Sequence, residues 1–152
     1  IQKEFSRIMS LKDGSKKMSK SELSDLSRIN LTDDKDTIVN KIKKAKTDPL
    51  PMPSSVEELT ERLEARNLLG IYSSLNNSSL QNTVENFSGK NFSEFKNQLS
   101  DLLVKKIEPI SLEIKKLLND QPYLDKILLE GVEKANSIAS KKIDRIKEIL
   151  GF

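Results

Sequence analysis

The residues best suited to chemistry in this sequence are the lysines of a short loop, residues 14–22, with the sequence GSKKMSKSE. This loop contains three lysines, three serines and one methionine. Ammonium groups on flexible stems stabilise negative charge that develops on a phosphate or another polyanion, and they do so without transferring a proton. The same composition is also typical of a solvated basic turn, so the rest of the sequence must distinguish the two interpretations.

The composition excludes most other kinds of chemistry. The 152 residues include no histidine and no cysteine, which excludes a Ser-His-Asp triad, thiolate nucleophiles, disulfides and cysteine-based zinc sites. The net charge of +3 is mildly basic and suits an anionic partner. No apolar run approaches the ~18 residues that span a bilayer. Any chemistry in this chain must therefore depend on charge.

The elements next to the loop are a predicted strand and an irregular segment. The strand is expected from Phe5 to Leu11, and the turn signal KDG follows it, with Gly14 free to adopt a positive φ. On the other side of the loop, residues 21–31 show no clear period.

A helix is predicted to follow from Thr32. Aspartates crowd its first turn, lysines fill its last turn, and Ile38, Ile42 and Ala45 share one face. Asp48-Pro49 ends this helix. The three prolines of DPLPMPSS then predict an extended connector.

Two further helices are expected after the connector. The segment Ser55 to Glu58 fits a capping box that begins the first of them, with an apolar stripe of Ala65, Leu68, Leu69, Tyr72 and Leu75. The segment Asn76 to Ser79 ends this helix and caps a short one, which Ser88-Gly89 closes.

The last third of the chain predicts two long helical segments. An apolar face runs from Phe92 to Leu118, and Pro109 is expected to kink this helix or split it in two. A final helix reaches about Leu150, and its predicted inward-facing residues are Leu124, Ile127, Leu128, Val132, Ala135, Ile138, Ala139, Ile143 and Ile146. The predicted fold class is therefore mainly α, with one strand at its front.

A phosphate-binding P-loop is one interpretation of the lysine-rich loop. Gly14, Ser19, Lys20 and Ser21 differ by one residue from the pattern G-x-x-x-x-G-K-[ST]. Ser19 stands where the second glycine would let the backbone approach a phosphate. No later apolar strand ends in an acidic residue that could hold magnesium, which argues against a P-loop.

A second interpretation comes from the loop sequence itself. Residues 17–21 are KMSKS, which resembles the signature loop of class I aminoacyl-tRNA synthetases, and RIMSLKDGSKKMSKS (7–21) resembles the same region of bacterial tryptophanyl-tRNA synthetases. The similarity continues in family order through INLTDDKDTI (29–38), KIKKAKTDP (41–49), NLLGIYSSL (67–75) and EGVEKANSIAS (130–140). The chain therefore resembles the C-terminal part of a bacterial-type tryptophanyl-tRNA synthetase.

The resemblance implies a domain organisation. Residues 1–31 would be the end of a Rossmann-type catalytic, nucleotide-binding domain, comprising its last strand and the KMSKS loop. Residues 32–152 would be the α-helical C-terminal domain that binds tRNA through the anticodon. The HIGH-like motif and the tryptophan pocket would precede Ile1, so the chain is expected to be a fragment that is inactive alone.

The activity implied by the resemblance is tryptophan–tRNA ligation. ATP with Mg²⁺ is the substrate that activates L-tryptophan to the aminoacyl-adenylate, which is transferred to tRNA(Trp). The full-length enzyme is implied to be a cytoplasmic homodimer that does not bind a membrane. No metal site is implied in this chain. Lys17 and Lys20 are the implied catalytic residues, and the implied ATP-binding residues are Ile8, Met9, Lys17, Met18, Ser19, Lys20 and Ser21, with Ile8, Met9 and Met18 near the adenine.

The sequence departs from the resembled family in two places. Glu22-Leu23 stands where many relatives have Asp-Pro, so a less rigid exit from the loop is expected. Arg62-Leu63-Glu64-Ala65 stands where relatives often have Arg-Pro-Glu-Ala, so an earlier helix start is expected. Neither departure changes the loop lysines.

The lysine pairs at 43–44, 105–106, 115–116 and 141–142 have two interpretations. They are most simply solvated helix faces, and the resemblance also makes them candidates for contact with the tRNA backbone.

The alternative to an enzyme is a stand-alone helical module that binds RNA or a protein and keeps KMSKS without catalysis. A HIGH-like strand, loop and helix in the preceding reading frame would decide for the enzyme. Tyrosyl-tRNA synthetases are the nearest alternative within the class.

Overall fold

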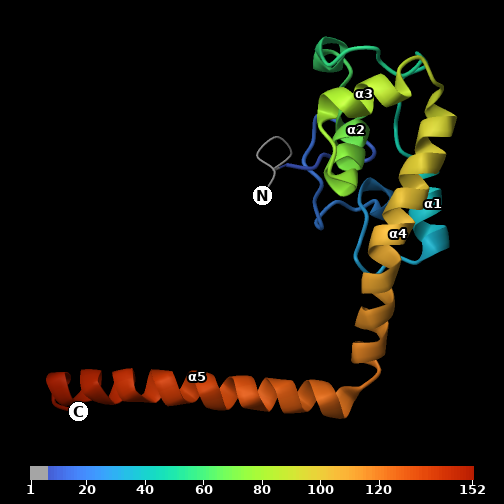
Figure 1. The fold of residues 1–152 in the computed structure, drawn as a ribbon. Coiled ribbons are helices and arrows are strands. Elements are labelled where there is room, and N and C mark those ends of the chain that lie inside the picture. The colour runs from blue at the N-terminus through green and yellow to red at the C-terminus, as the bar shows by residue number, and fades with distance from the viewer. Residues whose placement is uncertain (1–6) are drawn as a thin grey trace. The chain divides into compact units, whose positions relative to one another are not determined.

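The computed structural model describes residues 7–152, and every regular element in that range is helical (Figure 1). Two 3₁₀ helices, η2 (Asp25–Ser27) and η3 (Glu57–Thr60), accompany the α-helices α1 (Lys35–Lys43), α2 (Leu63–Asn76), α3 (Leu80–Phe87), α4 (Phe92–Leu118) and α5 (Gln121–Leu150). The predicted mainly α fold class is confirmed. Within residues 7–152, no helix combines the length and the apolarity needed to cross a membrane.

The chain separates into two units by its internal contacts. The first unit ends at Leu112, and the second comprises Glu113–Phe152. The lysine loop and α1 to α3 belong to the first unit together, so no structural division falls between residues 31 and 32. The predicted division into a catalytic end and a tRNA-binding domain concerns function, and it stays a prediction.

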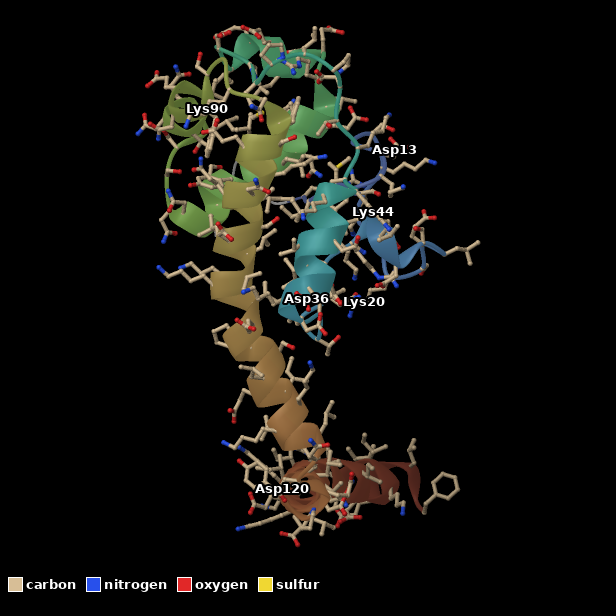
Figure 2. All side chains as sticks on the ribbon, turned by 90° about the vertical axis from the view of Figure 1, so that its right-hand side faces the viewer. Asp13, Lys20, Asp36, Lys44, Lys90 and Asp120 are labelled. Atoms are coloured by element: carbon tan, nitrogen blue, oxygen red, sulfur yellow. The ribbon has the colours of Figure 1, made fainter. Side chains whose placement is uncertain are left out.

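Helix α1 forms in the predicted segment, but it begins at Lys35 and not at Thr32 as predicted. Asp34 caps its N-terminus by accepting a hydrogen bond from the backbone N–H of Thr37 at 2.9 Å. Ile38 and Ile42, one turn apart, are completely buried. Figure 2 shows Asp36 and Lys44 at opposite ends of α1, an arrangement of charge that complements the helix dipole.

A lysine of α4 holds the C-terminal end of α1. The Nζ atom of Lys96 donates to the carbonyl oxygen of Ala45 at 2.7 Å and to that of Lys43 at 3.2 Å. Burial of this ammonium group lowers the pKa of Lys96. The two bonds satisfy carbonyl groups that the helix end leaves without partners, and they place α1 beside α4.

Helix α2 begins at Leu63, so the capping box predicted from Ser55 is wrong. The Glu58 carboxylate accepts a bond from the Ser54 N–H at 3.3 Å instead, and a 3₁₀ turn precedes the helix. Arg62 has a non-helical backbone (φ −118°, ψ 69°), while its guanidinium binds both carboxylate oxygens of Asp48 at 2.6 and 2.9 Å. This contact with the proline connector lies at the point where α2 begins. The expectation that the helix begins earlier than in relatives stays a prediction.

Three aromatic rings join α2, α3 and α4 in the core. The ring centroids of Tyr72 and Phe87 are 4.9 Å apart, and those of Phe87 and Phe95 are 4.8 Å apart, both in edge-to-face geometry. Asn77 ends α2 in the left-handed conformation, and Ser79 caps α3, as predicted. Aliphatic residues complete the core around these rings, including Leu59, Leu68, Leu69, Val84 and Leu99.

Helix α4 is not split at Pro109, although a split was one predicted outcome. The helix runs from Phe92 to Leu118 with this proline inside it. A proline removes one backbone donor, which a helix of this length can lose while its other hydrogen bonds remain. On the next turn, the Ser111 hydroxyl donates to the backbone oxygen of Thr32 at 3.2 Å.

Helix α5 forms as predicted, but its apolar residues are not buried. Asp120 caps the helix by accepting from the Tyr123 N–H at 3.1 Å, and Gly151 ends it with φ 78°. None of its residues is buried, so the prediction that its apolar stripe faces inward is wrong for this structure. The stripe remains exposed at Ile127, Leu128, Val132, Ile138, Ile143 and Ile146.

Candidate phosphate-binding site

A short backbone pairing joins the lysine loop to the segment that precedes it. The N–H of Met18 donates to the oxygen of Ile8 at 3.0 Å, and the N–H of Ser10 donates to the oxygen of Lys16 at 2.8 Å. These bonds make an isolated antiparallel bridge between Met9 and Lys17. Residues 7–11 contain this bridge but do not form a strand. The first part of the strand predicted from Phe5 to Leu11 lies outside the described residues.

An asparagine of α2 takes the place that a neighbouring strand would occupy beside Met9. The Met9 N–H donates to Asn67 Oδ1 at 2.9 Å, and Asn67 Nδ2 donates to the Met9 oxygen at 2.9 Å. Asn67 is buried, so this two-way bond is shielded from water. One side chain from α2 therefore satisfies both backbone groups of Met9 and fixes the segment that leads into the loop.

Leu11 connects the same segment to two other elements. Its N–H donates to the oxygen of Ser27 at 2.9 Å, and its oxygen accepts from the N–H of Lys46 at 2.7 Å. The Leu11 side chain is almost completely buried. The start of the loop is thus held by α2, by η2 and by the end of α1.

A positive φ was predicted at Gly14, but the structure does not show one. Glycine is needed there because the loop backbone packs closely against α2. The non-helical glycines with positive φ in the described chain are Gly89 and Gly151. A Cβ atom at Gly14 would lie 2.7 Å from the carbonyl carbon of Leu63 and 2.8 Å from the nitrogen of Glu64. Only glycine lets the loop backbone rest this closely on the first turn of α2.

Replacing Gly14 by alanine should therefore destabilise the protein by about 1–3 kcal/mol, because the added methyl group meets backbone atoms that cannot turn away. Urea unfolding would measure this loss. The matched control is Gly131→Ala in α5, where an added Cβ meets nothing within 4 Å. That control should be neutral or stabilising by about 0.5–1 kcal/mol. Equal effects of the two substitutions would contradict the role of close approach.

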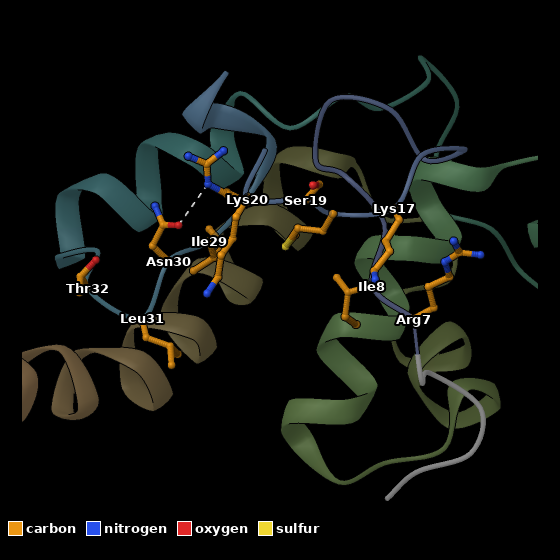
Figure 3. A pocket seen from close by; sticks show the side chains of 11 residues that line it. Arg7, Ile8, Lys17, Ser19, Lys20, Ile29, Asn30, Leu31 and Thr32 are labelled. Atoms are coloured by element: carbon orange, nitrogen blue, oxygen red, sulfur yellow. Dashed lines mark hydrogen bonds between the residues drawn. The ribbon is translucent and has the colours of Figure 1, made fainter. Parts of the chain in front are cut away.

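A cavity of ≈ 570 Å³ lies between the loop and the segment that follows it (Figure 3). Figure 3 shows Lys17 beside Ile8 at one side and Lys20 near Ile29 and Asn30 at the other. The residues that line it are Arg7, Ile8, Lys17, Met18, Ser19, Lys20, Arg28, Ile29, Asn30, Leu31 and Thr32. The structure thus brings five of the predicted site residues together: Ile8, Lys17, Met18, Ser19 and Lys20.

Two predicted site residues do not line the cavity. Met9 is not a lining residue, and its backbone is bonded to Asn67. Ser21 follows the lining residues, and its N–H donates to the Ser19 hydroxyl at 3.2 Å. Both residues contribute to the conformation of the loop in this structure.

The charges around the cavity are those of an anion site. Its lining includes four cationic side chains, those of Arg7, Lys17, Lys20 and Arg28, and no aspartate or glutamate. Lys17 and Lys20 are exposed, and neither forms an ion pair with a described residue. Their charges are therefore available to an anion that enters the cavity.

Lys16 differs from the other two loop lysines. Its Nζ atom lies 3.5 Å from Asp13 Oδ2, and it does not line the cavity. Asp13 also accepts bonds from the hydroxyl and the N–H of Ser15, at 2.6 and 3.0 Å. These bonds from Ser15, assisted by Lys16, lower the pKa of Asp13 and keep it ionised. The structure thus separates one lysine that stabilises the turn from two that face the cavity.

Sequence reasoning missed the far wall of the cavity. Residues 28–32 return past the loop and contribute Arg28 and Asn30, in a segment without periodicity. The available signal was local: two polar residues alternate with Ile29 and Leu31 immediately after a candidate anion loop. Asn67 was also missed, because nothing in the sequence shows that it reaches a residue 58 positions away.

A family model described as "tRNA synthetases class I (W and Y)" matches residues 2–108. The chain belongs to this family.

Tryptophan–tRNA ligases of bacteria are among the relatives of this chain. It is 51% identical over 146 residues to the tryptophan–tRNA ligase of Agrobacterium fabrum, covering 96% of this chain and 41% of that protein. It is 45% identical to the tryptophan–tRNA ligase of Caulobacter vibrioides over all 152 residues, which are 44% of that protein. The predicted resemblance to bacterial tryptophanyl-tRNA synthetases is confirmed, and the chain spans about two-fifths of these curated relatives.

A solved structure shows the same relationship. The crystal structure of tryptophanyl-tRNA synthetase from Mycoplasma pneumoniae superposes with a TM-score of 0.69 at 25% sequence identity. The match covers 96% of this chain and 44% of that one. The helical architecture described above is therefore found within a protein of this class.

Proposed function

We propose that this chain is part of a tryptophan–tRNA ligase. In this proposal the full-length enzyme activates L-tryptophan with ATP·Mg²⁺ and transfers it to tRNA(Trp), as a cytoplasmic homodimer. The observation that carries the proposal is a pair of lysines, Lys17 and Lys20, that share a cavity and have no acidic partner among residues 7–152, in a chain of the synthetase family. The names of the relatives support tryptophan as the amino acid.

The proposed chemistry needs charge and no proton transfer. A carboxylate oxygen of tryptophan forms a bond to the α-phosphorus of ATP, and the bond from that phosphorus to the bridging oxygen breaks. The electron pair leaves on pyrophosphate, whose negative charge increases in the transition state. Lys17 and Lys20 stabilise this charge from the cavity. This step fits a chain with no histidine and no cysteine.

The remaining site residues have supporting roles in the proposal. Ser19 and Ser21 offer hydroxyl and backbone donors to the phosphates, and the half-buried side chains of Ile8 and Met18 form an apolar wall for the adenine. Both backbone groups of Met9 are bonded to Asn67, which supports a role in holding Ile8 in place.

The direct test is aminoacylation by the full-length protein. Purified enzyme, ATP·Mg²⁺ and radiolabelled tryptophan should produce acid-precipitable tryptophanyl-tRNA, whereas radiolabelled tyrosine should remain at background. The 152-residue chain alone is expected to charge nothing, since it spans about two-fifths of the related ligases. Formation of tyrosyl-tRNA would mean that tyrosine, and not tryptophan, is the substrate. A folded full-length protein that charges neither amino acid would favour the stand-alone binding module.

The helical part is proposed to bind tRNA through exposed lysines. Lys105 and Lys106 on α4 are exposed and unpaired among the described residues, whereas Lys46 and Lys116 are paired with Glu64 and Glu113. The unpaired lysines are therefore the better candidates for phosphate contacts.

Replacing Lys105 and Lys106 together by glutamine should weaken tRNA binding and flatten its salt dependence. Each lost phosphate contact should reduce the slope of log K against log salt by roughly 0.7 to 0.9. Filter binding over a range of salt concentrations would measure both quantities, and tryptophan-dependent pyrophosphate exchange should stay unchanged. Asp101→Asn, on the same helix, is a control that should not weaken binding. An unchanged slope in the lysine variant would leave these residues as a solvated face.

A further inference from the structure

The segment that follows the lysine loop is held by a polar cluster centred on Asp25. Asp25 Oδ2 lies 2.6 Å from the Nζ atom of Lys41, and Asp25 Oδ1 lies 2.9 Å from Nη2 of Arg28. Oδ1 also accepts from Asn30 Nδ2 at 3.0 Å. These partners, Lys41 first, hold the pKa of Asp25 below its ordinary value. We call Asp25, Arg28, Asn30 and Lys41 the Asp25 clasp.

The anchor of the Asp25 clasp is a buried cation. Lys41 lies on the inner face of α1, between Ile38 and Ile42, and is only 2% exposed. It forms a second ion pair with Asp33, which is itself buried, at 2.7 Å. A buried ammonium group requires such partners, because an unpaired charge in the interior is strongly unfavourable. Lys41 therefore fixes the Asp25 carboxylate against α1.

Arg28 extends the clasp to the end of the KMSKS loop. Its Nη1 donates to the backbone oxygen of Glu22 at 2.9 Å, and its Nε donates to Asn30 Oδ1 at 3.2 Å. With Nη2 on Asp25, each of the three guanidinium nitrogens has a protein partner. The Arg28 side chain thus lines the cavity. Its planar guanidinium group also joins residue 28 to the backbone of residue 22.

The other backbone bonds of residues 22–24 join near neighbours: the Glu22 N–H donates to the Ser19 oxygen at 3.4 Å, and the Ser27 N–H donates to the Ser24 oxygen at 3.0 Å. Glu22, Leu23 and Ser24 are exposed, and the Leu23 side chain is fully exposed. The Arg28 bond to the Glu22 oxygen lies two residues after Lys20. The position of Lys20 on the cavity therefore depends on the clasp as well as on the backbone pairing at the start of the loop.

We propose that Asp25 and Arg28 are positioning residues for the KMSKS loop: anchored on buried Lys41, they hold the loop exit against α1 and so place Lys20 over the cavity. The expected effect on kcat rests on the proposed function, whereas the expected effect on the conformation of the loop does not. Neither residue needs to touch the substrate. Loss of the clasp should let the loop sample other positions, and misplacing a catalytic group by about 1 Å can cost about 10²-fold in rate.

The test uses the full-length enzyme with Arg28→Gln, Asp25→Asn and the double variant. In tryptophan-dependent pyrophosphate exchange, each single variant should lower kcat by up to about 10²-fold, with a much smaller change in KM for ATP. The double variant should be no worse than the more affected single variant, because both substitutions break one connection. The matched control is Arg66→Gln, which removes an exposed arginine with no side-chain partner among the described residues.

Hydrogen–deuterium exchange supplies a readout that does not need activity. Amides of residues 16–24 should exchange faster in both single variants, while those of α2 and α3 keep their wild-type protection. If the wild-type enzyme shows no exchange of pyrophosphate at all, the proposed function fails and the amide measurement alone decides on the clasp. Unchanged loop protection, a loss of protection that extends through α2 and α3, or additive losses in the double variant would each overturn the proposal.

Discussion

Replacing Lys20 by alanine in the full-length ligase is expected to lower kcat for tryptophan-dependent pyrophosphate exchange by about 10²-fold to 10³-fold. The Lys20 ammonium is exposed on the cavity and has no acidic partner among the described residues. The negative charge it opposes develops mainly in the transition state, so KM for ATP should change much less than kcat. Lys17→Ala should act in the same way with a smaller effect.

Lys16 provides the matched control within the same loop. Its ammonium is paired with Asp13 at 3.5 Å, and it does not line the cavity. Lys16→Ala removes the same charge from the same stretch of chain, yet it should leave kcat close to the wild-type value. If Lys16→Ala and Lys20→Ala had equal effects, general loop charge would explain the chemistry. An effect of Lys20→Ala on KM alone would mean that Lys20 binds only ground-state ATP.

Replacing Phe95 by alanine should lower the free energy of unfolding by about 3–5 kcal/mol. The Phe95 side chain is completely buried, and its ring contacts those of Phe87 and Tyr72 at centroid distances of 4.8 and 6.0 Å. Removing it leaves a cavity where α2, α3 and α4 meet. Because α2 also carries Asn67, the loss reaches the support of the lysine loop.

Urea unfolding followed by circular dichroism would measure this effect, with Phe152→Ala as the control. Phe152 is 91% exposed, so its truncation should change the stability by less than about 0.5 kcal/mol. The same chemical change is thus compared at a buried and an exposed position. A Phe95→Ala loss no larger than that of Phe152→Ala would contradict the role of the aromatic cluster.

The helices that the sequence predicted well are those whose signals are local. Asp34 caps α1 and Ser79 caps α3 through bonds to residues three positions ahead, and Ile38 and Ile42 lie one turn apart. Caps and stripes of this kind act within a few residues, so their pattern is visible in the chain itself.

The predictions that were wrong depend on contacts between distant segments. Ser55 to Glu58 resembled a capping box, but Arg62 binds Asp48 and moves the start of α2 to Leu63. Gly14 lies in the predicted turn, but a positive φ was expected there, whereas the observed reason for glycine is its contact with Leu63. Such competition between a local pattern and a distant partner cannot be judged from local spacing.

The candidate site divides in the same way. Lys17 and Lys20 could be predicted because the lysine-rich motif is contiguous, Ile8 and Met18 followed from the family resemblance, and all four line the cavity. Arg28 could not, because its role depends on bonds to Glu22 and to Asp25, which is itself fixed by Lys41 on α1. The motif identified the charged groups, and the fold shows what holds them.

The most direct test of the central claim is pyrophosphate exchange by the full-length wild-type enzyme and by its Lys17→Ala/Lys20→Ala variant, each supplied with every standard amino acid in turn. We expect tryptophan alone to support exchange by the wild-type enzyme. We expect the double variant to remain folded and to lose at least about 10²-fold of that rate. A double variant that exchanges pyrophosphate as fast as the wild-type enzyme would contradict the claim that these lysines stabilise the leaving pyrophosphate.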